Sequence, residues 1–428
     1  MFNMQNKVIH NIGWHIAGKV FQSLINLFVG LLTARYLGPN NYGLINYAAA
    51  YTSFFSAICT LGINSVIVKE FIDKPECEGK ILGTSLVLRA ISSVLSAIAI
   101  IGISLILDAN EPETQLVVVL YSLSLCINIF EVFNYWFQSK LQAKKTAIAS
   151  LAAYTLTAIY KVGLLALSKP VGYFAVATSL DYLCVAVILV VFYIQEGGKR
   201  LSFSWTYGKQ LLSKSQYYIW AGLMVAIYAQ TDKLMLKQLV NETEIGYYST
   251  ALSLCNVWGF VLSAIITSMN PVIMQAHSVD NTKFIRLNSM LYSIIFYISS
   301  FVSLVFFFGG KIIISMMYGE AYLPAETSLK ILTWQTGFSY LGVARNTWIV
   351  CENKQKYLSC LYTSGALTNV VLNILFIPNY GASGAAFASL VAQIVTTLIA
   401  PFFIKAIRRN SFMMLDGILF RWIGLPPN

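Results

Sequence analysis

Charged residues are scarce in this 428-residue chain, at 11% of the total. Soluble globular domains carry roughly 25%. Histidine occurs three times, and the seven cysteines are scattered without a CxxC pair or a cysteine–histidine cluster. We interpret the cysteines as small buried hydrophobic residues rather than metal ligands or a disulfide framework.

Motifs of catalysis are also missing from the sequence. It holds no phosphate-binding GxxxxGK[ST] loop, no HExxH and no GxSxG, so nothing indicates nucleotide hydrolysis, zinc chemistry or a serine nucleophile. We expect no enzyme activity, no cofactor and no metal. The formal net charge of +11 does not indicate nucleic-acid binding, because no contiguous soluble basic domain exists.

Long uncharged runs dominate the sequence instead, and about 20 apolar residues are enough to span a bilayer. Residues 36–68 and 90–107 carry no charge, and neither does the stretch 357–404, which is interrupted by Pro-Asn-Tyr-Gly at 378–381. We therefore predict an all-α polytopic membrane protein with twelve transmembrane helices. Their approximate ranges are 11–33, 42–66, 81–107, 115–138, 146–168, 171–194, 211–237, 246–270, 286–308, 327–350, 357–377 and 383–405.

Basic residues are concentrated in every second segment between these helices. Examples are Lys69, Lys74 and Lys80 after the second predicted helix, and Lys144 and Lys145 after the fourth. Cytoplasmic loops of membrane proteins are enriched in lysine and arginine. The alternation predicts an even number of helices with both termini in the cytoplasm, and it explains the positive net charge by the negative membrane surface.

The two halves of the chain share short patterns. Tyr42-Gly43 follows the first predicted helix and Gly246-Tyr247 follows the seventh. Six helices per half make a parallel repeat, related by an axis along the membrane normal. Chance matches are the alternative reading. The repeat predicts lobes at 1–194 and 211–406, a cytoplasmic linker at 195–210 and a cytoplasmic tail at 407–428.

Polar residues line one face of several predicted helices. His15, Lys19, Gln22 and Asn26 follow steps of four, three and four, which place them on one side of a helix, and Asn256 belongs to a similar stripe. Such residues can hydrogen-bond neighbouring helices together, or they can line a wet cavity. The charged Lys19 favours the cavity.

Among the ionisable residues inside predicted helices, seven are candidates for functional roles, because a charge at the bilayer centre costs about 2.5–3.5 kcal/mol on insertion scales. A structural Lys161–Asp181 ion pair, snorkelling of Arg89 and Arg345, and an interfacial position for Asp232 are the alternatives to functional roles. The seven are Lys19, Arg89, Glu131, Lys161, Asp181, Asp232 and Arg345.

Two segments resemble a known family. The sequence Ala-Arg-Tyr-Leu-Gly-Pro at 34–39, followed by Tyr42-Gly43, resembles the first loop of the Wzx-type polysaccharide and O-antigen flippases of the multidrug/oligosaccharidyl-lipid/polysaccharide exporter superfamily. Asn369 and Asn373, with the segment 377–386, resemble its helix 11–12 region. The resemblance implies two six-helix lobes around a central cavity lined largely by helices 1, 2, 7 and 8.

The resemblance also implies a function. Members flip undecaprenyl-pyrophosphate-linked oligosaccharide from the cytoplasmic to the periplasmic leaflet of the bacterial inner membrane. We expect coupling to H⁺ or Na⁺, and association with membrane lipids, a glycan polymerase and a chain-length regulator. The expected substrate-binding residues are Lys19, Gln22, Asn26, Arg35, Arg89, Lys161, Asn256 and Arg345. The expected ion-coupling residues are Glu131, Asp181 and Asp232.

Two other functions fit parts of the sequence. A multidrug or cation antiporter of the same superfamily would have the same fold, although the net basic character of the predicted cavity disfavours cationic drugs. A membrane-embedded glycan polymerase would need a large periplasmic loop with catalytic arginine or histidine, and no such loop is visible in the sequence.

Overall fold

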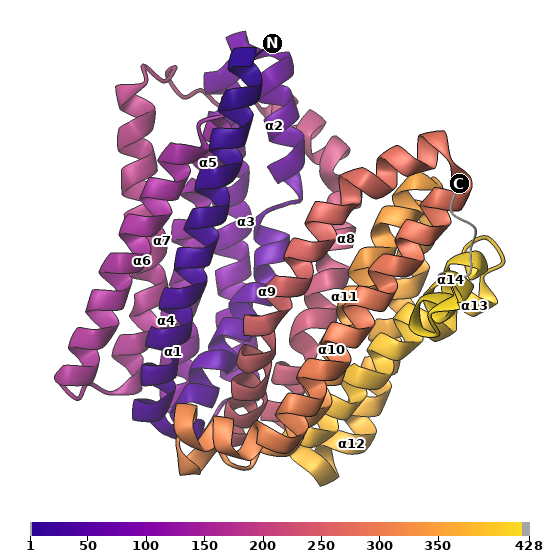
Figure 1. Ribbon diagram of the computed structural model, residues 1–428. Coiled ribbons are helices and arrows are strands. Elements are labelled where there is room, and N and C mark those ends of the chain that lie inside the picture. The colour runs from indigo at the N-terminus through magenta and orange to yellow at the C-terminus, as the bar shows by residue number, and fades with distance from the viewer. Residues whose placement is uncertain (1, 422–428) are drawn as a thin grey trace. The chain divides into compact units, whose positions relative to one another are not determined.

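The computed structural model (Figure 1) describes the backbone of residues 2–421, and their side chains apart from those of 2–21, 23, 24, 65 and 221. Within this range every regular element is a helix. The predicted all-α membrane fold is confirmed. Seven helical stretches of the described chain are long and apolar enough to span a membrane: Pro75–Leu107, Pro112–Ser139, Ala143–Ala166, Val171–Gln195, Glu242–Val279, Asn281–Tyr318 and Gln355–Phe403.

The chain divides into two compact units, which are described separately. The first holds residues up to 37 and 44–230, and the second holds 38–43 and the chain from 231 onward. These units differ in extent from the predicted lobes at 1–194 and 211–406, which remain a prediction. The long helices are α1 (Phe2–Cys59), α3 (Glu78–Leu107), α6 (Ala143–Ala166), α7 (Val171–Gln195), α8 (Trp205–Leu239), α9 (Glu242–Val279), α10 (Asn281–Tyr318), α11 (Ala325–Cys351) and α12 (Leu358–Ile394).

Two long helices are interrupted at glycines that lie between predicted spans. Non-helical backbone at Gly38 (φ 71°) splits α1, and Gly381 (φ 52°) splits α12. Each of these long helices therefore covers one predicted span and part of a second, and the structure is compatible with twelve. The shorter elements are α2 (Ile63–Asp73), η1 (Pro75–Cys77), α4 (Pro112–Ile127), η2 (Asn128–Glu131), α5 (Val132–Ser139), η3 (Glu320–Tyr322), η4 (Gln355–Tyr357), η5 (Val395–Ile399), α13 (Ala400–Phe403) and α14 (Arg408–Ile418).

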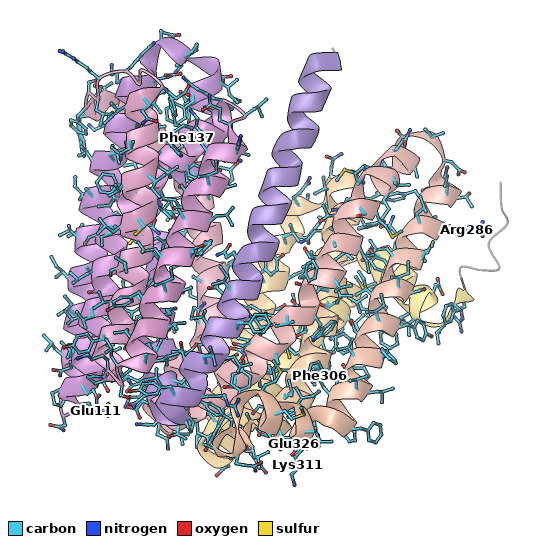
Figure 2. All side chains as sticks on the ribbon, turned by 60° about the vertical axis from the view of Figure 1, so that its left-hand side comes forward. Glu111, Phe137, Arg286, Phe306, Lys311 and Glu326 are labelled. Carbon is cyan, nitrogen blue, oxygen red and sulfur yellow. The ribbon has the colours of Figure 1, made fainter. Side chains whose placement is uncertain are left out.

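The core of the first unit gathers around aromatic residues of α5 and α7. Trp136 is fully buried, and its ring centroid lies 4.8 Å from those of both Phe137 and Tyr193 in edge-on contacts. Aromatic pairs in this geometry stabilise a fold by more than the burial of their apolar area alone. Figure 2 shows Phe137 near one end of this unit and Glu111 near the other, so the α4–η2–α5 stretch traverses its full length.

The second unit packs α9, α10, α11 and α12 together, with α14 against α10 (Figure 1). Ser293 donates a hydrogen bond to the carbonyl oxygen of Gly417 over 2.6 Å, and Asn410 donates one to the Tyr292 hydroxyl over 2.7 Å. Both bonds are buried. The predicted tail at 407–428 therefore begins with a helix that is fastened to the membrane unit.

Two helical glycines of the second unit, Gly43 in α1 and Gly246 in α9, make reciprocal close contacts. A Cβ on Gly43 would lie 1.8 Å from the Glu242 carbonyl oxygen, and a Cβ on Gly246 would lie 2.1 Å from that of Pro39. Only glycine allows such close backbone approach. Glu242 precedes Gly246 by four residues, and Pro39 precedes Gly43 by four. The two contacts are therefore equivalent to each other, as in a two-fold arrangement. The repeat of two six-helix lobes itself stays a prediction.

Candidate substrate-binding site

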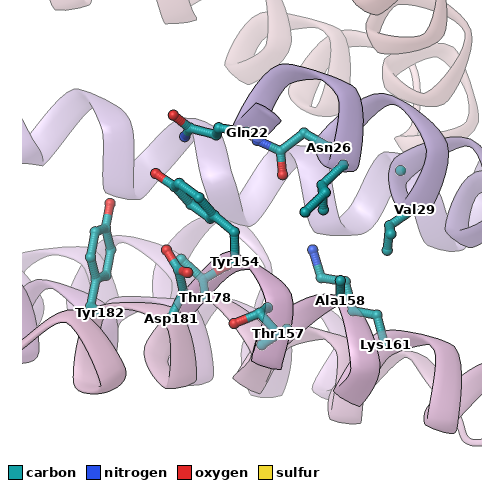
Figure 3. Close-up of a pocket in the computed structure, with 13 residues that line it drawn as sticks. Gln22, Asn26, Val29, Tyr154, Thr157, Ala158, Lys161, Thr178, Asp181 and Tyr182 are labelled. Atoms are coloured by element: carbon teal, nitrogen blue, oxygen red, sulfur yellow. The ribbon is translucent and has the colours of Figure 1, made fainter. Parts of the chain in front are cut away.

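A polar pocket of about 280 Å³ lies in the first unit, between α1, α6 and α7 (Figure 3). Its lining combines amide, hydroxyl, carboxylate and ammonium groups with two tyrosine rings. The polar members are Gln22, Asn26, Tyr154, Thr157, Lys161, Thr178, Asp181 and Tyr182.

Helical periodicity places these side chains on shared faces. Tyr154, Thr157 and Lys161 follow steps of three and four along α6, and Thr178 and Asp181 are three residues apart on α7. Residues at such spacings lie on one side of a helix. The α6 and α7 faces point toward α1 in Figure 3, and α6 and α7 pack side by side.

Lys161 and Asp181 both line this pocket without touching each other. No ion pair within 4.0 Å joins them among the described contacts, so the direct Lys161–Asp181 pair that the sequence suggested is absent from this structure. The Oδ1 atom of Asp181 is buried and has no hydrogen-bond partner in the described part of the chain. The pocket therefore holds two opposite charges with unfilled hydrogen-bonding capacity.

The pocket brings together four of the residues predicted from sequence. Gln22 and Asn26 come from α1, Lys161 from α6 and Asp181 from α7. Lys19 belongs to the same predicted stripe as Gln22, but its side chain lies outside the described residues. Arg35 is exposed near the end of the first half of α1.

Arg89 and Glu131 form a separate cluster in the first unit. Their side chains make an ion pair over 2.8 Å, and the Tyr135 hydroxyl donates to Glu131 over 3.3 Å. Arg89 is 1% exposed. The Arg89 guanidinium also lies 3.5 Å from the side-chain oxygen of Asn128, where η2 interrupts the helix. Neither residue lines the pocket.

Arg345 and Asn256 both lie in the second unit, on α11 and α9. Arg345 is 1% exposed and donates a hydrogen bond over 2.8 Å to the carbonyl oxygen of Thr396, within the π-helical turn η5. No acidic side chain pairs with it among the described residues. Asn256 is exposed on α9. The role of both residues in substrate binding remains a prediction.

Asp232 forms the centre of a buried network in the second unit. Asn369 and Asn373 donate to its Oδ1 over 2.9 and 2.7 Å. Tyr248 donates to its Oδ2 over 2.5 Å, and Ser389 also donates to Oδ2. Asp232 is 4% exposed. Its carboxylate is therefore surrounded by oxygen- and nitrogen-bearing side chains from α9 and both halves of α12.

Sequence reasoning missed several of these residues. Tyr154, Thr157 and Tyr182 were not singled out, although the three- and four-residue steps around Lys161 and Asp181 were a usable signal. Asn369 and Asn373 entered only through the family resemblance. Their four-residue spacing puts both amides on one helix face, but nothing in the sequence connects them to Asp232.

Known proteins resemble the chain over most of its length. A family model described as "Polysaccharide biosynthesis protein" matches residues 8–277. The capsular polysaccharide biosynthesis protein CapF of Staphylococcus aureus is 20% identical, covering 94% of this chain and 100% of its own. An uncharacterized membrane protein of Methanocaldococcus jannaschii is 18% identical, covering 98% of this chain and 88% of its own.

Solved structures share the fold. The lipid II flippase MurJ in an inward closed conformation superposes with a TM-score of 0.72 at 16% identity, covering 97% of this chain and 94% of its own. An inward-facing multidrug resistance MATE transporter of the MOP superfamily reaches 0.65 at 17% identity, covering 91% and 96%. The fold is that of the transporters of this superfamily. Since the family model also matches more than half of its length, the chain belongs to the polysaccharide biosynthesis protein family.

Proposed function

We propose that the protein is a flippase for undecaprenyl-pyrophosphate-linked oligosaccharide, such as an O-antigen repeat unit. It moves the glycan from the cytoplasmic to the periplasmic leaflet of the bacterial inner membrane by alternating access, with both termini cytoplasmic. It carries out no covalent chemistry. A glycan polymerase and a chain-length regulator are the proposed partners that act on the translocated glycan.

The names of similar proteins support this proposal. A relative is named for capsular polysaccharide biosynthesis, and a structural neighbour is a lipid II flippase. A glycan cannot cross hydrocarbon unaided, because each unbonded polar group costs several kcal/mol there. A polar path through a membrane protein is therefore needed.

The pocket between α1, α6 and α7 is the observation that carries the proposal. A lysine and an aspartate in membrane helices are costly to insert, and a purely structural role would be served better by a direct ion pair. Here Lys161 and Asp181 face a shared cavity with hydroxyl and amide groups. Such a lining can exchange hydrogen bonds with a sugar. We assign the pyrophosphate to Lys19 and Arg35, because phosphate is held well by cationic donors.

Asp232 is the proposed site of ion coupling. Its carboxylate is buried and accepts hydrogen bonds from the amide groups of Asn369 and Asn373 and from the hydroxyl groups of Ser389 and Tyr248. The side-chain oxygen of Asn373 is buried and has no partner in the described part of the chain. A buried carboxylate can take up and release a proton, and rotation of the two amides would turn their oxygens toward a hard cation such as Na⁺.

Deletion of the gene in the native host tests the function. We expect lipid-linked repeat units to accumulate on the cytoplasmic leaflet and surface glycan to be lost, with both effects reversed by the wild-type gene. Lys19→Ala, produced at wild-type levels, should fail to reverse them. Normal surface glycan in the deletion strain would contradict the proposal.

A multidrug antiporter is the second candidate, because a MATE transporter shares the fold. Lys161 and Asp181 both line the pocket, so it offers no net negative charge to a cationic drug, which disfavours this reading. If the protein exports drugs, the deletion strain will become sensitive to cationic dyes while its surface glycan stays intact.

A further inference from the structure

We propose that the pocket between α1, α6 and α7 binds one neutral sugar ring of the transported glycan, and that the pyrophosphate binds elsewhere. This inference rests on the proposed flippase function and names the part of the substrate that this site receives. It separates the substrate into a sugar held by the first unit's pocket and an anionic group held outside it.

The size of the pocket limits its ligand. Pockets that enclose drug-sized molecules measure roughly 300–1,000 Å³, and this one measures about 280 Å³. It lies just below the lower bound of that range, so it accommodates a single ring more readily than a complete repeat unit. The remaining sugars of the glycan must therefore lie outside it.

The charges that face the pocket select a neutral ligand. An anion entering the pocket would be attracted by Lys161 and repelled by Asp181, and a cation would meet the reverse. Neither gains a net advantage that offsets the loss of its hydration. A sugar hydroxyl both donates and accepts. Neighbouring hydroxyls can therefore accept from the Lys161 ammonium and donate to the Asp181 carboxylate, which do not touch each other.

An unsatisfied atom is ready for such a ligand. The Oδ1 atom of Asp181 is buried without a hydrogen-bond partner in the described part of the chain, and an unsatisfied buried acceptor costs about 1–3 kcal/mol. A ligand hydroxyl that donates to this oxygen removes that cost. The new hydrogen bond to Asp181 Oδ1 then contributes favourably to the free energy of binding.

The rest of the lining suits a ring with apolar and polar faces. Tyr154 and Tyr182 supply aromatic rings with hydroxyl tips, and such side chains combine an apolar surface with a polar handle. Gln22 and Asn26 of α1 supply amides that can both donate and accept. Figure 3 shows these residues on opposite sides of the space that a ring would fill.

Ligand-observed NMR on the full-length protein in detergent tests the selectivity. The probes are a panel of neutral methyl glycosides with gluco, galacto, manno and N-acetylglucosamine rings, a methyl glucuronide and a methyl glucosaminide. We expect saturation transfer to at least one neutral glycoside and weaker transfer to the anionic and cationic probes. Stronger binding of either charged probe, or no binding of any neutral one, would overturn the proposal.

Variants locate the binding. Asp181→Asn and Asn26→Ala should each weaken neutral-glycoside binding at least tenfold. Asn26 is exposed, so we expect Asn26→Ala to fold. It keeps the test valid if Asp181→Asn does not fold. Thr155→Ala is the matched control, because Thr155 is exposed on α6 and bonds only to its own helix, at the carbonyl oxygen of Leu151. Unchanged binding in both pocket variants would overturn the assignment.

Complementation separates failure of this inference from failure of the proposed function. If the deletion strain accumulates lipid-linked glycan and Asp181→Asn restores surface glycan fully, the flippase function stands and the sugar pocket fails. If the deletion strain shows no accumulation, the flippase function itself fails.

Discussion

Asn373 donates a hydrogen bond to the Asp232 carboxylate over 2.7 Å, inside the second unit. Asn369, one helical turn earlier, donates to the same oxygen over 2.9 Å. Two amides from the first half of α12 thus bind a carboxylate from α8. Because both partners are buried, changes at either end leave unsatisfied polar atoms in the interior.

Asp232→Asn should abolish ion-coupled transport. The substitution removes the charge and presents an amide to groups that already donate hydrogen bonds, so at least one donor loses its partner. We expect translocation to fall at least tenfold and to lose its dependence on the ion gradient. Asp416→Asn is the control, since Asp416 lies near the surface of α14 and pairs loosely with Arg421 over 3.9 Å. Full gradient-dependent activity in Asp232→Asn would remove Asp232 from the coupling mechanism.

The reciprocal glycine contact should not tolerate side chains. In Gly43→Val or Gly246→Val, the new Cβ would lie about 2 Å from a backbone carbonyl oxygen, and backbone cannot move aside as a flexible side chain can. We expect each variant to lose more than about 2 kcal/mol of stability, measured as thermal unfolding in detergent. Gly102→Ala, which meets no atom within 4 Å, should unfold as the wild type does. Equal melting temperatures for all variants would show that α1 and α9 separate at this contact at little cost.

Glu70 should contribute pH-dependent stability to the first unit. Burial raises the pKa of Glu70, but hydrogen bonds from Lys214, Tyr207 and Lys74 outweigh it and lower the pKa from 4.5 to about 2. A depressed carboxyl pKa stabilises the folded state above the unfolded value and loses that effect as pH falls through the folded value. Glu70→Gln should therefore melt lower than the wild type at pH 7, with the gap closing between about pH 4.5 and pH 2. A gap that does not change with pH would contradict this account.

Arg345 should hold the η5 turn in place rather than contact substrate. Its guanidinium donates to the Thr396 carbonyl oxygen in the π-helical turn, and the side chain is 1% exposed. Arg345→Met should lower thermal stability, since the carbonyl loses its partner, and Arg345→Lys should retain part of it. If Arg345→Met keeps wild-type stability but loses transport, the sequence-based role in substrate binding gains support instead.

The sequence predicted the membrane fold well because hydrocarbon imposes strong rules. An uncharged run as long as 90–107 is expected to form a helix in a bilayer, and α3 ends at Leu107 as predicted. Helix interruptions were harder to foresee. The break at Asn128–Glu131 lies inside an apolar run, where periodicity carries no signal for a 3₁₀ turn.

Parts of the candidate site were also predictable. Gln22 and Asn26 were found from helical spacing, and Lys161 and Asp181 from the cost of burying charge. Which of these residues meet depends on how α1, α6 and α7 pack, and one sequence does not report that packing. The sequence also did not show that Glu131 contacts Arg89, with which it forms an ion pair in the structure. The role of Glu131 in ion coupling remains a prediction.

Reconstitution tests the central claim most directly. Purified full-length protein is placed in liposomes that carry undecaprenyl-pyrophosphate-linked oligosaccharide on the inner leaflet, and an impermeant glycosidase is added outside. The account predicts that an imposed ion gradient makes the inner pool of glycan accessible, and that Asp232→Asn and Asp181→Asn slow this at least tenfold. An inner pool that stays protected in wild-type proteoliposomes as well as in protein-free vesicles would contradict it.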